Sequence, residues 1–204
     1  MNEILANIKN RRSRRSFIDK NIPDMVIEEI LEAARYAPSG FNKQPWNFIV
    51  VSNKDVIRQL SIIIRRIVAR IMPLFPLFQI FKPELRDPKV TGAMKKTLSS
   101  DTDTVFYNAP LLILVTAAKD ASRYAVKDCA FASQNMMLYA RSVGISSCFV
   151  GRADFLKMSK EAVKITGLPP GYIIHAAIVF GYAPDSEAAA IPERRRDNVI
   201  SWVR

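Results

Sequence analysis

Histidine and cysteine are scarce in this chain of 204 residues, which holds one histidine and two cysteines. Cys129 and Cys148 stand too far apart for the usual spacing of zinc ligands, so the sequence predicts no metal site. The two thiols need not form a disulfide in a reducing compartment. Charged residues occur from Glu3 and Lys9 onward, which leaves no room for the apolar core of a secretory signal. These absences predict a cytoplasmic protein without a metal.

Long apolar runs and phosphate-binding glycine motifs are lacking too. The most apolar region, residues 62–81, is interrupted by Arg65, Arg66 and Arg70 and by two prolines. Three arginines near the centre of a bilayer would be very costly, so we expect no membrane-spanning helix here. Neither G-x-G-x-x-G after a strand nor G-x-x-x-x-G-K-[ST] occurs, which argues against a Rossmann dinucleotide site and an ATPase.

Positive charge is abundant, with 30 Lys and Arg against 19 Asp and Glu and a net charge of +11. Such a chain could bind nucleic-acid phosphates, and its basic amphipathic stretch 55–71 could bind a membrane surface. The charge gathers in two clusters, at residues 9–15 and 194–196, and each cluster could also be a solvated surface. Two clusters placed around one phosphate explain the distribution more economically than nucleic acid does. We therefore expect neither nucleic acid nor a membrane as a partner.

Hydrophobic periodicity predicts helices and strands that alternate along one domain spanning residues 1–204. Mixed elements of this kind suit an α+β fold in which helices cover the faces of a sheet. We expect helices at residues 2–9, 24–37, 55–71, 124–143 and 154–166, the last capped by Asp154, and strands at 46–51, 110–117, 145–150 and 172–181.

Residues 72–105 have no clear hydrophobic period, and we interpret them as an insertion or lid. Phe75, Phe78 and Phe81 lie in this stretch, and Phe106 lies just beyond it. Two alternatives stay open for these aromatic side chains. They could form the wall of a substrate pocket, or they could pack under helix 55–71 as ordinary core.

Two motifs resemble signatures of the nitroreductase family. Residues 11–17, RRSRRSF, are similar to its N-terminal signature, and residues 37–46, APSGFNKQPW, are similar to its second one, with a single helix between them. Further similarity lies at residues 108–110, 128–135, 144–151 and 167–172. The resemblance covers nearly the whole chain except about residues 60–105. It implies a three-layer α-β-α fold with a mostly antiparallel central sheet, assembled as a homodimer.

The resemblance also implies FMN as cofactor, with NADH or NADPH as electron donor. FMN presents a dianionic phosphate, a hydroxylated chain and a ring with a polar edge, so its site needs cationic forks and short polar groups. Residues 11–15 supply both. By resemblance, Arg11 and Ser13 would reach the phosphate and ribityl chain, with Arg12 beside them, and Arg15 would reach the ring edge.

Further cofactor contacts follow from the other similar segments. By resemblance, the second motif would approach the flavin from the partner subunit through Pro38, Ser39, Gly40, Asn42 and Gln44. Val150, Gly151 and Arg152 fall where the family often has a Gly-Gly pair near flavin N5, and Arg152 departs from that pattern. Its side chain could narrow the pocket or favour an anionic acceptor, or it could point to solvent. Arg194 or Arg195 could complete the phosphate clamp.

The function implied is a two-step hydride transfer through flavin N5, in which NAD(P)H reduces the flavin and a small acceptor such as a nitroaromatic or quinone reoxidises it. No catalytic side chain is expected, because the cofactor carries the chemistry. The sole histidine, His175, lies in an apolar strand and is best interpreted as core. Alternatives are another flavin task on the same fold, namely dehydrogenation, dehalogenation or flavin breakdown, or a basic nucleic-acid or membrane-surface binding protein.

Overall fold

Four antiparallel strands form the centre of the protein in a computed structural model that describes residues 2–184, 193–194 and 200–203. The sheet has the order β1-β2-β4-β3, so the two strands in its middle, β2 and β4, come from distant parts of the chain. Their register pairs Ile113 with Ile178 and Leu114 with Ala177. The strands are β1 (Asn47–Val51), β2 (Leu111–Ala118), β3 (Ser146–Phe149) and β4 (Tyr172–Gly181).

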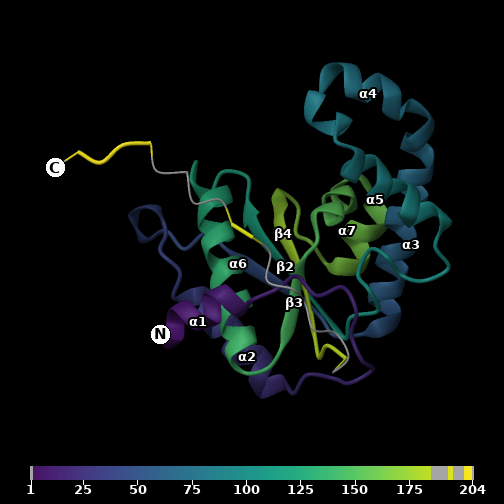
Figure 1. Cartoon of the computed structure of the whole chain (residues 1–204). Helices are drawn as coiled ribbons and strands as arrows, with labels where there is room; N and C mark the ends of the chain where they lie inside the picture. The colour runs from purple at the N-terminus through teal and green to yellow at the C-terminus, as the bar shows by residue number, and fades with distance from the viewer. Residues whose placement is uncertain (1, 185–192, 195–199, 204) are drawn as a thin grey trace.

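Helices cover both faces of this sheet (Figure 1). Successive residues of β2 point to opposite faces and reach two separate cores. Leu111 and Ile113 join the core under α2 and α6, whereas Leu112 and Leu114 join the core under α3. The predicted α+β fold with three layers and an antiparallel sheet is therefore confirmed. One side carries α1 (Glu3–Asn10), α2 (Asp24–Arg35) and α6 (Ala125–Ser142), and the other carries α3 (Lys54–Ile71), α5 (Pro88–Ser99) and α7 (Lys160–Thr166).

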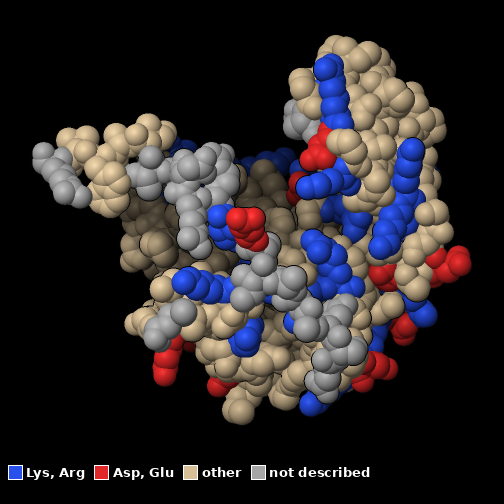
Figure 2. Space-filling view, in the orientation of Figure 1, with Lys and Arg blue, Asp and Glu red and all other residues tan. Residues whose placement is uncertain are grey.

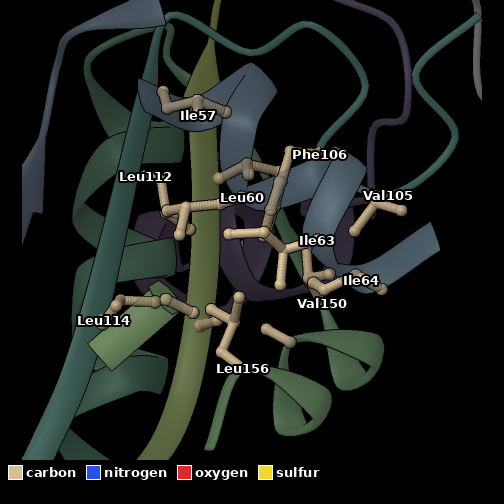
Figure 3. Packing of buried hydrophobic residues seen from close by; sticks show 14 of the residues in the cluster. Ile57, Leu60, Ile63, Ile64, Val105, Phe106, Leu112, Leu114, Val150 and Leu156 are labelled. Atoms are coloured by element: carbon tan, nitrogen blue, oxygen red, sulfur yellow. The ribbon is translucent and has the colours of Figure 1, made fainter. Parts of the chain in front are cut away.

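Helix α3 supplies one wall of the larger core. Its stripe of Ile57, Leu60 and Ile64 lies on Phe106, which is fully buried, and on β2 (Figure 3). The predicted amphipathic stretch 55–71 is thus a core-facing helix, with its arginines mostly off the buried stripe. No helix in the described part of the chain is long and apolar enough to cross a membrane.

The stretch 72–105 is helical, which corrects the expectation of irregular structure. It contains the short helices η2 (Met72–Leu74), α4 (Phe75–Phe81) and η3 (Pro83–Arg86), and then α5. Each of the four begins with a proline in its first turn. Proline is tolerated there because the first N–H groups of a helix have no partner within it. The prolines that obscured the period are helix starts, and α4 projects away from the sheet (Figure 1).

The predicted helix 154–166 is wrong in its first half. Residues Gly151–Met158 form the 3₁₀-helix η4, and α7 begins only at Lys160. Ser159, not Asp154, caps α7, because its hydroxyl accepts a hydrogen bond from the N–H of Ala162 at 3.2 Å. Strand β1 lies at the sheet edge and leaves Val50 40 % exposed.

Candidate functional site

The basic N-terminal segment runs along the free edge of β3. Ser13 pairs with Ser147 as a parallel bridge, and the N–H of Arg14 donates to the carbonyl of Ser147 at 3.0 Å. Alternate side chains of an extended segment point to opposite sides. From Arg12 onward we therefore expect Arg12 and Arg14 on one side of the sheet edge and Ser13 and Arg15 on the other.

One side gathers around Cys148, which belongs to the α3 core and is 1 % exposed. Burial raises the pKa of the Cys148 thiol, and the positive charges of Arg15, Arg11 and Arg152 together with a hydrogen bond from Ser13 pull that pKa back down. Arg11, Ser13 and Arg15 thus all act on the pKa of this thiol. These three residues along β3 are called the cationic edge below.

The other side opens into a cavity of about 290 Å³. Arg11, Arg12 and Arg14 line it together with Arg141 at the end of α6 and with Ala183 and Pro184, so Arg11 reaches this cavity as well as the Cys148 side. The guanidinium of Arg12 donates to the carbonyls of Lys9 at 2.6 Å and Arg11 at 2.7 Å, which closes the end of α1. The Arg12 guanidinium is thus bonded to the end of α1, and its predicted contact with FMN stays a prediction.

The second motif forms a tight loop after α2. The Ser39 hydroxyl accepts from the N–H of Gln44 at 3.0 Å, and the Gln44 amide donates to Asn42 at 3.0 Å. Phe41, Asn42 and Gln44 all have positive φ angles, of 55°, 55° and 45°. Such backbone costs free energy for residues other than glycine and is concentrated at functional sites. The loop is therefore fixed in shape in advance of any ligand.

Helix α6 holds this loop in place. The carboxylate of Asp128, 2 % exposed, accepts the N–H of Gly40 at 3.2 Å, while its second oxygen has no partner within the described structure. A Cβ at Gly40 would lie 2.7 Å from the Tyr124 ring, so only glycine fits here. The sequence offered Asp128 only as part of a similar segment, and its anchoring role became visible in the tertiary structure.

Gly151 begins η4 directly after β3. The N–H groups of Gly151 and Arg152 stand at the start of this helix, where backbone donors have no partner within the helix. A Cβ built on Gly151 meets no atom within 4 Å, so its surroundings are open. The Arg152 side chain departs from both sequence alternatives. It points neither to solvent nor into an open pocket, but donates to the carbonyls of Ala93 and Thr104 and to the Tyr107 hydroxyl.

The remaining predicted positions are the arginines of the C-terminal tail and His175. Arg194 is described and exposed, whereas Arg195 lies outside the described residues. His175 is half-buried in β4, and its Nε2 atom has no hydrogen-bond partner among the described residues. Burial and the charge of Lys157 lower the His175 pKa, with Asp154 opposing them.

The four-stranded antiparallel sheet with helices on both faces defines a three-layer α+β protein, and sequence comparison specifies the family. The profile of the nitroreductase family matches residues 8–182, so the chain belongs to the nitroreductase family. A protein of Archaeoglobus fulgidus, provisionally named NADH dehydrogenase/NAD(P)H nitroreductase, is 29 % identical over 191 residues, covering 92 % of this chain and 89 % of that protein.

Solved structures agree with this assignment. A nitroreductase with bound FMN from Bacteroides fragilis superposes with a TM-score of 0.79 at 28 % identity, and a second from Desulfitobacterium hafniense with 0.78 at 27 %. Each comparison covers 100 % of both chains. The fold that the resemblance implied is thereby confirmed over the whole length.

Proposed function

We propose that this protein is an FMN-dependent oxidoreductase that takes hydride from NADH or NADPH and reduces small acceptors such as nitroaromatics or quinones. The single observation that carries the proposal is the cationic edge over β3, in a fold whose matched structures bind FMN. The archaeal relative carries a nitroreductase name, which supports the same activity.

The residues present fit FMN. Arg11 and Ser13 offer a fork of donors and a hydroxyl for the phosphate and ribityl chain, and Arg15 offers a cation for the N1 and O2 edge of the ring. The open space at Gly151 admits a flat ring, and the backbone donors of Gly151 and Arg152 suit flavin N5, whereas the N–H of Val150 already donates to the carbonyl of Ala177. From the tail, Arg194 or Arg195 would complete the phosphate clamp.

The protein's contribution to the reaction is binding and orientation. FMN, when bound, supplies the hydride acceptance and donation at N5. Arg15 would stabilise negative charge at the ring edge, because a fixed cation there favours the anionic reduced form. The open face beside Gly151 would receive nicotinamide first and the acceptor second. None of these steps requires an acid–base side chain, which agrees with the absence of a predicted catalytic residue.

We further infer a homodimer with two FMN sites, in which Pro38, Ser39, Gly40, Asn42 and Gln44 approach the flavin of the partner. The exposed apolar side chains of α1, α6 and the loop support an interface: Ile4, Leu5, Ile8, Phe41, Val126 and Phe131. Phe41, 88 % exposed, stands at the tip of the preformed loop. Apolar surface gathered in this way usually marks an interaction site.

Residues 72–105 would form an insertion in a single domain and help to select the acceptor. The aromatic residues in and beside this stretch fall into two groups. Phe75 and Phe106 are buried in the core, whereas Phe78 and Phe81 are 41 % and 76 % exposed. Only the exposed pair is available to a pocket wall or to a partner. A cytoplasmic location also stays a prediction, supported by two free cysteines.

The decisive experiment is a spectrum of the purified protein under anaerobic conditions. We expect flavin absorption bands that bleach on addition of NADH or NADPH and return on addition of a nitroaromatic or quinone. Sedimentation of the yellow protein should give a dimer at micromolar concentration. A colourless protein that fails to bind added FMN would refute the proposal, and a flavoprotein that ignores these acceptors would favour another flavin task.

A further inference from the structure

Arg152 connects the helical excursion between α3 and β2, defined here as residues 72–107, to the turn at Gly151. Its Nη1 donates to the carbonyl of Ala93 in α5 at 3.1 Å, and its Nη2 donates to the carbonyl of Thr104 and, at 3.0 Å, to the Tyr107 hydroxyl. One guanidinium thus bonds three acceptors from two different parts of the excursion. The side chain is half-buried, so these contacts are shielded in part from water.

Asp103 binds the same turn as a hydrogen-bond acceptor, whereas Arg152 binds it as a donor. One carboxylate oxygen accepts the N–H groups of Val105 at 2.9 Å and Phe106 at 3.1 Å and also the Ser61 hydroxyl at 2.6 Å. The other oxygen accepts the N–H of Asn108 at 3.3 Å. The donors of the turn are therefore bound by a carboxylate and its acceptors by a guanidinium.

This turn needs such support because its backbone is strained. Tyr107 and Asn108 have φ angles of 60° and 52°, in the left-handed region that residues other than glycine rarely occupy. Backbone of this kind persists only where the surroundings fix it, and such places are common near functional sites. Arg152 and Asp103 together provide that constraint at the point where the excursion returns to the sheet.

We propose that Arg152 is a positioning residue that fixes the excursion against the Gly151 turn and so sets which acceptors reach the flavin. The inference rests on the proposed function, because it takes Gly151 to lie beside flavin N5. Arg152 is the next residue in the chain, so any movement of the excursion is transmitted to the backbone at the predicted reaction centre. A lysine could not replace it, since a single ammonium cannot reproduce a planar fork with three acceptors in fixed directions.

Arg65 offers a matched control in the same region. Its Nη2 donates to the carbonyl of Leu98 at 3.3 Å and joins α3 to α5, at the end of α5 away from Ala93. It therefore contacts the excursion as Arg152 does, through a guanidinium on a carbonyl, but without a link to Gly151. A role confined to stability would affect both residues alike, whereas a positioning role belongs to Arg152 alone.

The test uses the FMN-loaded protein with three substitutions, Arg152→Met, Tyr107→Phe and Arg65→Met. Hydrogen exchange of residues 90–107 measures how firmly Arg152 holds the excursion, a role called the clamp below. The ratio of flavin reoxidation rates with a bulky and a small quinone measures acceptor selection. For Arg152→Met we expect exchange to rise roughly tenfold and the ratio to change at least about fivefold, because one charged hydrogen bond is worth about this factor. Tyr107→Phe removes one of the three acceptors and should move both readouts in the same direction by a smaller factor. Arg65→Met should leave the ratio unchanged.

Three results would overturn the inference. Unchanged exchange in Arg152→Met and Tyr107→Phe would show that no clamp exists. Faster exchange with an unchanged acceptor ratio would reduce Arg152 to a stabilising residue, and a changed ratio without faster exchange would mean that Arg152 itself touches the acceptor. If Arg152→Met does not fold, Tyr107→Phe still tests whether the clamp exists. Failure of the proposed function would be distinct, because the wild type would then bind no FMN while the exchange arm still tested the clamp.

Discussion

The cationic edge and the helical excursion are held to the same sheet by different means. The edge lies along β3 through backbone contacts, a parallel bridge at Ser13 and the Arg14 N–H bond to Ser147. The excursion is held where it returns to the sheet by side chains that reach backbone groups, chiefly Arg152 and Asp103. Backbone contacts tolerate substitution of side chains, whereas the excursion depends on a few particular residues.

This difference suits a two-substrate flavin enzyme. Cofactor contacts need a constant frame, which the sheet edge supplies, and their side chains are then free to face the ligand. The excursion, which we propose to select acceptors, could change without disturbing that frame, because its anchors are separate from it. Figure 2 shows Lys and Arg side chains on the projecting helical part of the molecule as well as on its body, so charge alone does not distinguish the two regions.

The strongest test of the contrast is Phe75→Ala, because Phe75 joins the base of the excursion to the α3 core and is only 4 % exposed. We expect the free energy of unfolding to fall by about 3–5 kcal/mol, as for other buried phenylalanines. Urea unfolding with Phe81→Ala as control measures this, since Phe81 is exposed and its loss should cost less than about 0.5 kcal/mol. Equal costs for the two would show that Phe75 does not join α4 to the α3 core.

On the cationic edge, Arg15→Ala should weaken FMN binding by about 1.5–3 kcal/mol, the value of a hydrogen bond to a charged group. Arg14→Ala is the matched control, because Arg14 lines the cavity on the opposite side of the segment. FMN dissociation constants from fluorescence titration decide the matter. Equal constants for both variants would contradict the division of the basic run between two sides.

Removal of the excursion's second anchor by Asp103→Ala should cost about 1–3 kcal/mol of stability, because several backbone donors lose their acceptor. The neighbouring Asp101 is exposed, so Asp101→Ala should be nearly neutral. Thermal unfolding of both variants, beside FMN content, separates the two regions. If Asp103→Ala released FMN without loss of stability, the anchors of excursion and cofactor edge would not be independent.

The smallest expected effect concerns Cys129, which lies in α6 and belongs to the core under α2 and α6. Burial, followed by the charge of Asp128, raises the Cys129 pKa from 9.0 to about 12. Between these pH values the unfolded chain loses the proton while the folded protein keeps it, so the thiol's contribution to stability falls as pH rises. The difference in stability between wild type and Cys129→Ala should therefore narrow from pH 8.5 to 10.5. A constant difference, measured by urea unfolding, would contradict the raised pKa.

Much of the architecture was predictable because the strands and long helices carry strong local patterns. The apolar run of β2 and the stripe of α3 each indicated their burial correctly. The excursion was not predictable in the same way, because its four helices are short and begin with prolines, which break any hydrophobic period. The candidate site followed from two motifs whose residue types match FMN, while its cofactor contacts remain predictions.

By itself, the sequence determined the α+β elements, the basic segment and the loop motif, because these depend on patterns within about twenty residues. Only the tertiary structure decided which cations share a side, that Asp128 anchors Gly40 and that Arg152 turns toward the excursion. Arg152 and Thr104 are 48 residues apart, and Gly40 and Asp128 are 88 apart. Contacts over such separations depend on how the sheet and helices pack, and no local pattern of residues records them.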